Sequence, residues 1–137
     1  MITVQNFVNG NFVSVKETIE DINPATGEII ANIPRSKAND VEVAVNAAET
    51  ARNSWSTLTL DERRDWLEKI ANALESRSED IAKLESLDTG KPIKLARTVD
   101  AARSVANFRF FAEFSKDYIE EKFEMDDATN HVMFKPV

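Results

Sequence analysis

The sequence KLESLDTGKPIKLARTVDAARSVANFRFF, from Lys83 to Phe111, joins two helical stretches. Gly90 favours the left-handed conformation that ends a helix, and Pro92 suits the first turn of a new one. The sequence therefore predicts a helix that ends at Gly90 and a long helix from about Pro92 to Glu121. A helix of that length is unusual for a chain of 137 residues. We expect it to lie across a larger body than this chain supplies.

Asp88 is an acid in the last turn of the first of these helices. The C-terminal end of a helix carries partial negative charge, so a carboxylate there costs about a few tenths of a kcal/mol unless a cation offsets it. The commoner interpretation is a carboxylate that is solvated or bonded to local backbone N–H groups near Thr89 and Gly90. The functional alternative is a hard cation held by Asp88 and nearby carbonyl oxygens.

Arg103 lies among the aromatic residues of the second helix. At helical spacing it shares one side with Val99, Asn107, Phe110 and Phe114. The commoner arrangement places the stem of such an arginine on apolar surface and its guanidinium in water. The functional alternative is a guanidinium in an aromatic-lined tunnel that binds a carboxylate through two parallel hydrogen bonds.

The helical pattern extends backwards from Gly90 to about Ser36. Its apolar residues recur three or four positions apart, first at Val41, Ala44, Val45, Ala48 and Trp55, then at Trp66, Leu67, Ile70 and Leu74. Thr59 and Ser76 are each followed three residues later by a glutamate, the pattern of a capping box. We therefore expect three helices in this region, which start near Ser36, Thr59 and Ser76.

Strand patterns occupy the N-terminal third and the tail. FVNGNFV (7–13) places two apolar runs around Asn9-Gly10, a pair that favours a type I′ hairpin turn. TIEDINPATGEIIANIP (18–34) reads as strand, turn and strand, and HVMFKPV (131–137) again as a strand. The predicted fold class is α+β: N-terminal β-strands, several α-helices including one long helix, and a C-terminal strand, in a single segment.

The composition excludes several classes of function. A net charge of -7 argues against a nucleic-acid or anionic-membrane surface, which needs clustered Lys and Arg. The absence of cysteine excludes disulfides, thiolate metal sites and a cysteine nucleophile in this chain. With His131 as its single histidine, a histidine metal site or a Ser-His-Asp triad lacks partners. No targeting or membrane-spanning pattern occurs, so we expect a cytoplasmic protein.

Beyond these patterns, the order of motifs resembles the N-terminal portion of the aldehyde dehydrogenase superfamily. The similar segments are FVNGNFV, INPATGEIIANIP, DVEVAVNAAETARNSWSTL, ERRDWLEKIANALESRSEDIAKLESLDTGKP and MFKPV. LDTGKP at its distance after INPATG is the most specific of them. LARTVDAARSVANFRFFAEF is similar to the subgroup that oxidises 2-hydroxymuconic and 2-aminomuconic semialdehydes.

The resemblance implies an NAD(P)-dependent oxidation of a small-molecule aldehyde to an acid by a homo-oligomeric enzyme. In the family a cysteine forms a thiohemiacetal and a glutamate activates water. These residues and the Gly-rich cofactor turn lie in sequence that this chain does not contain, so no catalytic or cofactor-binding residue is assigned here. We expect an N-terminal fragment that is inactive alone. The alternative from another class is a stand-alone, non-catalytic helical interaction module.

The resemblance also implies roles for particular positions. In several family members K+ or Na+ is held by the Asp of the LDTG segment and by backbone near the INP turn, which are Asp88, Asp21 and Ile22 here. In the muconic semialdehyde subgroup an arginine of the long helix binds the substrate carboxylate, and Arg103 is the matching position. Residues 1–130 would pack on the cofactor-binding domain, and 131–137 would start a strand of the oligomerisation sheet.

Overall fold

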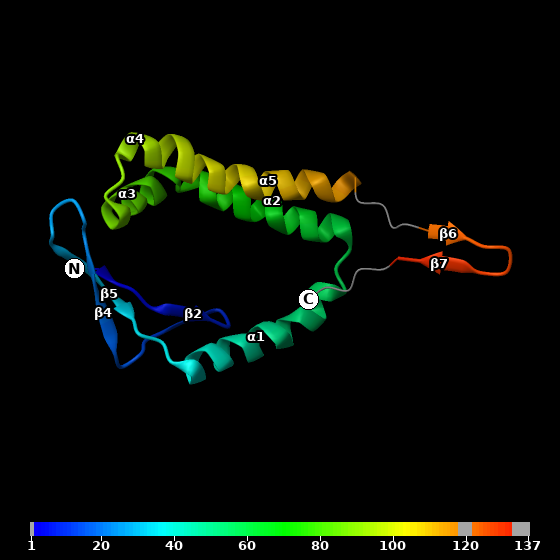
Figure 1. Cartoon of the computed structure of the whole chain (residues 1–137), viewed down its shortest axis with the longest axis horizontal. Coiled ribbons are helices and arrows are strands. Elements are labelled where there is room, and N and C mark those ends of the chain that lie inside the picture. Colours follow the sequence, from blue (N-terminus) through cyan, green and yellow to red (C-terminus); the bar gives the residue numbers. More distant parts are fainter. Residues whose placement is uncertain (1, 118–121, 133–137) are drawn as a thin grey trace.

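The computed structural model describes residues 2–117 and 122–132 (Figure 1). It confirms the predicted α+β class, because strands come first, helices follow, and a strand hairpin ends the described chain. None of the helices in these residues has the length and apolar composition of a membrane span.

The first hairpin forms where Asn9 and Gly10 were expected to turn. Strands β2 (Asn6–Val8) and β3 (Asn11–Val13) pair antiparallel, with Phe7 opposite Phe12. Both turn residues have positive φ, 50° at Asn9 and 78° at Gly10, as a type I′ turn requires. This prediction is confirmed.

A three-stranded sheet holds the INPATG turn. Strands β4 (Thr18–Ile22) and β5 (Ile29–Pro34) pair antiparallel, and their register shifts between Asp21 and Ile22. The side-chain oxygen of Asn23 accepts a hydrogen bond from the backbone N–H of Ala25 at 2.8 Å, which closes the turn. The predicted strand, turn and strand are confirmed. Strand β1 (Ile2–Thr3) adds a parallel pairing to β5 that local patterns did not predict.

The first two helices begin close to the predicted positions. Helix α1 (Ala38–Ser56) follows Lys37, whose backbone N–H donates to the Asp40 carboxylate at 2.7 Å. Helix α2 (Leu60–Ser76) has the predicted capping box. The Thr59 hydroxyl accepts from the backbone N–H of Glu62 at 3.2 Å, and the Glu62 carboxylate accepts from the backbone N–H of Thr59 at 2.8 Å.

The capping box predicted at Ser76 is wrong. Ser76 is the last residue of α2, and its hydroxyl donates to the backbone oxygen of Ala73 at 2.9 Å. Helix α3 (Ser78–Thr89) starts after Arg77 and has no side-chain cap bond at that end. The reason is that the α2 helix continues through Ser76, so its hydroxyl finds a partner one turn back. At the other end α3 stops at Gly90, with φ 71°, as expected.

The long helix is present but its hydrogen-bond pattern changes along its length. It consists of a short α-helical turn α4 (Ile93–Leu95), a π-helical turn η1 (Ala96–Ala101), helix α5 (Ala102–Phe114) and a 3₁₀ turn η2 (Ser115–Asp117). Its predicted end at Glu121 lies outside the described residues. The predicted side with Val99 and Arg103 is also altered, because Val99 belongs to the π turn and not to a regular α-helix.

The described chain ends in a hairpin that local patterns did not predict. Strands β6 (Lys122–Glu124) and β7 (Thr129–His131) pair antiparallel, and the hairpin projects away from the rest of the molecule (Figure 1). The predicted strand 131–137 is described only to Val132, so most of it lies outside the described residues.

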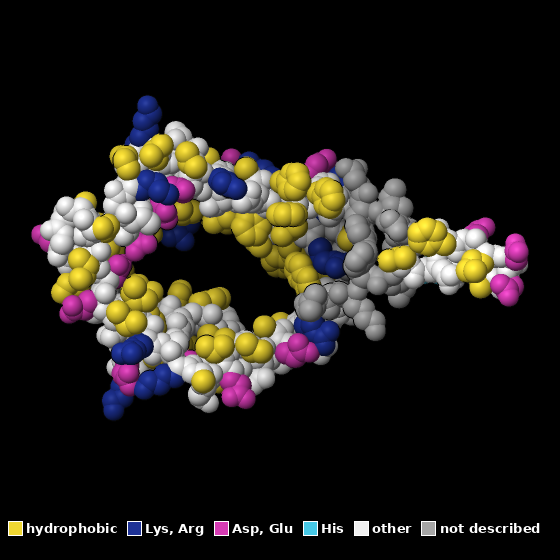
Figure 2. Space-filling model, in the orientation of Figure 1, with side chains coloured by type: hydrophobic (Ala, Val, Ile, Leu, Met, Phe, Trp, Pro, Cys, Tyr) yellow, Lys and Arg dark blue, Asp and Glu magenta, His cyan; other side chains and the backbone are white. Residues whose placement is uncertain are grey.

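Figure 1 shows α1 on one side and the α2–α5 pair on the other, with the N-terminal strands at one end and the loop between α1 and α2 at the opposite end. The buried apolar residues of the described chain are small: Ala31, Ala71, Ala82, Ala96, Ala101, Val105 and Ala112. Many large apolar side chains are exposed instead, and Figure 2 shows hydrophobic atoms on the facing sides of the two arms. The small residues allow close helix packing, but they leave the large side chains uncovered.

Candidate functional site

A groove forms where helix α3 meets the N-terminal sheet, and it brings two predicted cation ligands together. The groove has a volume of about 450 Å³ and is lined by Asp21 and Asp88 along with Glu85. Apolar residues form the rest of its wall: Ile2, Val4, Ile30, Ala31, Ile33, Ile81, Leu84 and Leu87. Ile22, the third predicted position, is exposed and is not among the lining residues.

Gly90 and Pro24 join the LDTG segment to the INPATG turn. A Cβ atom placed on Gly90 would lie 2.8 Å from Cγ of Pro24, which is closer than Cβ atoms pack in proteins. The left-handed φ of Gly90 and this close approach both favour glycine. The end of α3, with Asp88, is thereby held against the turn that follows Asp21.

The chemistry of this groove suits a hard cation only in part. Carboxylate oxygens such as those of Asp21 and Asp88 are the ligands that K+, Na+ and Ca2+ prefer. Within residues 2–117 and 122–132, however, no group of three or more His, Cys, Asp or Glu side chains is placed to hold a metal ion. A cation here would therefore depend on backbone carbonyl oxygens and water for most of its ligands.

Arg103 is exposed near the start of α5 and, among the described residues, makes no hydrogen bond or ion pair. The two neighbouring arginines on the same helix differ from it. Arg97 donates two hydrogen bonds to the Glu79 carboxylate, at 2.7 and 2.6 Å, and Arg109 donates to Glu75 at 3.0 and 2.7 Å. These bonds lower the pKa of both glutamates. Arg103 therefore keeps its guanidinium available for a further anion.

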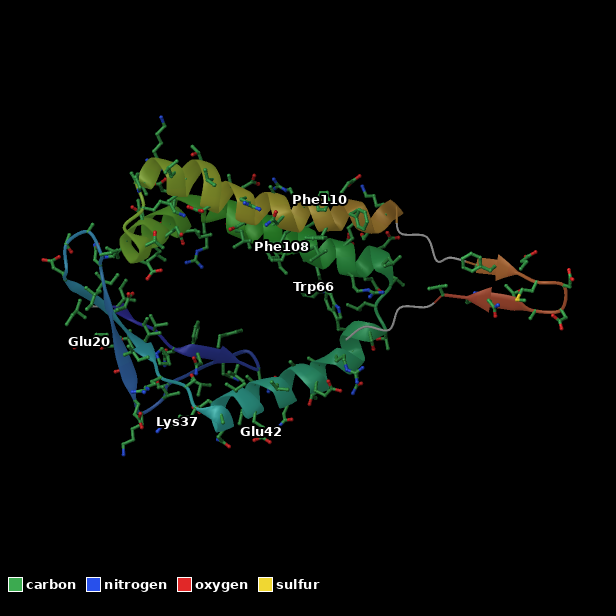
Figure 3. The ribbon with its side chains drawn as sticks, viewed as in Figure 1. Glu20, Lys37, Glu42, Trp66, Phe108 and Phe110 are labelled. Carbon is green, nitrogen blue, oxygen red and sulfur yellow. The ribbon has the colours of Figure 1, made fainter. Side chains whose placement is uncertain are left out.

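Helix α5 carries three of the aromatic residues that follow Arg103 in the sequence, Phe110, Phe111 and Phe114. Phe110 stacks on Phe114, with ring centroids 6.0 Å apart and 17° between the planes, and its edge contacts Phe111 at 5.2 Å. Figure 3 shows Phe110 on the outer side of the α2–α5 pair and Trp66 on the side that faces α1. A groove over α2 and α5 includes Arg97, Arg109 and Phe110 but not Arg103. The described residues thus supply aromatic surface without closing a tunnel around Arg103.

Lys91 is a residue that local patterns did not single out. It is partly buried, and its ammonium group lies 2.6 Å from a carboxylate oxygen of Asp100 and 3.4 Å from one of Glu85. The hydrogen bond to Asp100, above all, raises the pKa of Lys91. The pairing joins α3 to the π turn. It spans nine residues across a helix break, so no helical repeat in the sequence could have indicated it.

A model of the aldehyde dehydrogenase family matches residues 12–137. The chain belongs to the aldehyde dehydrogenase family.

Two curated relatives act on muconic semialdehydes, by their names. Human 2-aminomuconic semialdehyde dehydrogenase is 40% identical over 126 residues, which cover 92% of this chain and 26% of that enzyme. The 2-hydroxymuconic semialdehyde dehydrogenase of Pseudomonas sp. strain CF600 is 35% identical over 144 residues, which cover 99% of this chain and 30% of that enzyme. The resemblance predicted from the sequence motifs is therefore confirmed.

A solved structure gives the same result for the fold. The NAD+ complex of an aldehyde dehydrogenase from Bacillus cereus matches with a TM-score of 0.89 at 33% identity, over 95% of this chain and 28% of that one. The chain thus spans 26% to 30% of the length of these relatives. The described arrangement of strands and helices corresponds to a part of the aldehyde dehydrogenase fold.

Proposed function

We propose that this chain is the N-terminal portion of an NAD(P)-dependent enzyme that oxidises a carboxylated semialdehyde to the corresponding acid. The observation that supports the substrate class is Arg103, a cation without a partner among the described residues, in a chain 40% identical to a 2-aminomuconic semialdehyde dehydrogenase. A fixed guanidinium binds a carboxylate through two parallel hydrogen bonds and so orients the molecule that carries it.

The residues of this chain provide neither a binding site for a dinucleotide cofactor nor a cysteine nucleophile. A nicotinamide cofactor supplies the hydride acceptor in such an oxidation. A dinucleotide needs a Gly-rich turn at a helix N-terminus for its pyrophosphate. The three glycines here lie far apart, at Gly10, Gly27 and Gly90, and the sequence contains no cysteine. We therefore expect residues 1–130 to pack against a cofactor-binding domain and the chain by itself to form no NADH from an aldehyde.

Substrate selectivity in the full-length enzyme tests the proposal for Arg103. A charge-assisted hydrogen bond contributes ~1.5 to 3 kcal/mol, so Arg103→Ala should lower kcat/KM for a carboxylated semialdehyde by roughly 10- to 100-fold. A neutral aldehyde of similar length should lose much less, because it makes no such contact. Equal losses for both substrates would assign Arg103 to helix packing and leave the carboxylated substrate without residue-level support.

We also propose that the groove of Asp21 and Asp88 holds K+ or Na+, with the backbone oxygen of Ile22 as a further ligand. The supporting observation is that one groove contains both carboxylates. K+ should then raise the Tm of the full-length enzyme above its value in choline at equal ionic strength. In Asp88→Asn this increment should vanish, while the Tm in choline stays the same or rises slightly because the helix end loses a negative charge. An unchanged K+ increment in Asp88→Asn would contradict the site.

The alternative of a stand-alone interaction module predicts a different outcome. Such a module would be expressed without the rest of an aldehyde dehydrogenase, and its exposed apolar surface would bind another protein. Family membership over residues 12–137 favours the enzyme. The intact mass of the natural gene product distinguishes the two, because the enzyme requires a product several times longer than this chain.

A further inference from the structure

The π-helical turn Ala96–Ala101 sets the direction in which the side chains at the start of α5 point. In a π turn the hydrogen bond reaches one residue further than in an α-helix, so the turn accommodates an extra residue. One residue corresponds to about 100° of rotation in a helix of 3.6 residues per turn. Arg103 comes two residues after this turn. Its direction therefore depends on whether the turn is π-helical or relaxes to α-helical geometry.

Apolar packing alone defines the position of the π turn only weakly. The turn packs against α3 through Ala96 and Ala101, which form a buried cluster with Ala82, and Ile81 and Ile93 lie at its edge. Alanine side chains permit close contact between helices. Each buries little apolar area, so the alanine cluster contributes little of the free energy that holds the turn in one rotation.

Two ion pairs tie the same turn to α3 at defined points. Arg97 binds Glu79, and about half of each side chain is exposed (49% and 49%). Lys91 binds Asp100, and these side chains are less exposed (35% and 29%). Ion pairs that are less exposed are screened less by water and salt, so the pair of Lys91 is the stronger constraint.

The backbone around Lys91 is itself fixed to α3. The Ser86 hydroxyl donates to the backbone oxygen of Lys91 at 2.6 Å, and the Lys91 ammonium also reaches Glu85 of α3. On the other side, the backbone oxygen of Asp100 accepts from the hydroxyl of Ser104 at 2.9 Å. Lys91 is thus bound to α3 through Ser86 and Glu85. Its ammonium group binds the π turn at Asp100, three residues before Arg103.

We propose that Lys91 is a positioning residue for the carboxylate specificity of the enzyme. By binding Asp100 and Glu85 together, it maintains the π turn and so sets the direction in which the Arg103 guanidinium points. This inference rests on the proposed function of Arg103. Lys91 does not touch the substrate, and its effect passes through the helix.

The test uses the full-length enzyme and two substrates, a carboxylated semialdehyde and a neutral aldehyde of similar length. Lys91→Met removes the ammonium group and keeps a long apolar stem. It should lower kcat/KM for the carboxylated substrate about tenfold, because a small misplacement of a binding group is costly, and for the neutral one less than about twofold. Lys94→Met is the matched control, since the Lys94 ammonium has no ion pair among the described residues. It should change neither value.

Further variants separate positioning from general loss of structure. Asp100→Asn weakens the same contact from the other side and should act in the same direction, whereas Lys91→Arg keeps the cation and should restore selectivity. In an Arg103→Ala background, Lys91→Met should cause no additional selective loss. A crystal structure of the Lys91→Met enzyme should show the turn at Ala96–Ala101 changed from its π-helical form.

The outcomes for the two proposals are distinct. A selective loss in Arg103→Ala together with equal, small effects of Lys91→Met on both substrates would overturn the positioning role and leave the substrate class standing. The same holds if Lys91→Met reduces selectivity as strongly without Arg103 as with it. An Arg103→Ala enzyme that loses activity equally on both substrates would overturn both proposals.

Discussion

At the scale of single residues, Gly90 carries two constraints at once. Its φ of 71° ends helix α3, and its missing Cβ lets Pro24 approach. The first constraint was visible in the sequence, because Gly before a proline-initiated helix is a stop signal. The second was not, because it depends on a turn more than sixty positions earlier in the chain. Through this contact the LDTG and INPATG segments become neighbours.

Gly90→Ala should be more destabilising than the same change at Gly27. Gly27 has a similar φ of 74°, but an added Cβ there would meet nothing within 4 Å. Gly27→Ala should therefore cost only the left-handed strain of roughly 1 kcal/mol, whereas Gly90→Ala adds the overlap with Pro24 for a total of about 2–4 kcal/mol. Thermal melting of the full-length variants measures the difference. Equal decreases in Tm would show that the Pro24 contact relaxes without cost.

The same contrast between local and distant signals explains which residues of the site were predictable. Asp88 and Arg103 attracted attention because each conflicts with its local surroundings, an acid at a helix end and a cation among aromatics. Asp21 and Ile22 were predicted as cation ligands only from the family resemblance. Lys91 follows a helix stop, where a lysine is unremarkable, and its two acidic partners become visible only when α3 and the π turn are packed together.

At the scale of elements, the features set by neighbouring residues were predicted and those set by packing were not. The hairpin at Asn9-Gly10 and the capping box at Thr59 depend on four or five consecutive residues. Ser76 carries the same capping signal, but helix α2 continues through it, because sequence patterns do not state where a helix ends when no breaker follows. The π turn and the parallel pairing of β1 with β5 require contacts with distant elements, which periodicity does not contain.

The capping box of α2 should give the protein a stability that depends on pH. Hydrogen bonds from the backbone and hydroxyl of Thr59 lower the pKa of Glu62 below its ordinary value. A lowered pKa in the folded state stabilises the protein above the ordinary pKa of a glutamate, about 4.3, and this stabilisation disappears as the pH falls through the folded-state pKa. Glu62→Gln should therefore lower the Tm at pH 7 and have little effect near pH 3.

Two further variants test whether the effect of Glu62→Gln comes from the capping box. Thr59→Ala removes the hydroxyl acceptor and should cost about 1 kcal/mol. Glu42→Gln alters an exposed glutamate of α1 that takes no part in this cap, and it should lower the Tm at pH 7 less than Glu62→Gln does. A Glu62→Gln effect of the same size at pH 3 and pH 7 would show that the carboxylate contributes packing or helix propensity and not a charge-dependent cap.

At the scale of the whole molecule, the described residues do not enclose a core of large side chains. Helix α1 has no buried residue, and its apolar side lies over a groove of about 300 Å³ that includes Val41, Ala44, Val45 and Phe7 of β2. Val41 and Val45 are 56% and 58% exposed. The chain spans 26% to 30% of the length of its relatives. In the full-length enzyme proposed above, other parts would cover this side.

The isolated 137-residue chain should therefore self-associate, and Val45 should contribute to it. Contiguous apolar surface of this kind drives association in water, so light scattering should give a mass above that of the monomer, and a dye for apolar surface should bind. Val45→Lys should weaken both signals in the isolated chain but lower the yield of the folded full-length enzyme. Val43→Lys is the control, because Val43 has a similar exposed fraction, 53% against 58% for Val45, but lies two positions away, on the other side of α1. A compact monomer at high concentration that binds no dye would mean that this surface needs no cover. Equal effects of the two lysine variants would mean that the rest of the proposed enzyme does not cover the side of α1 that carries Val45.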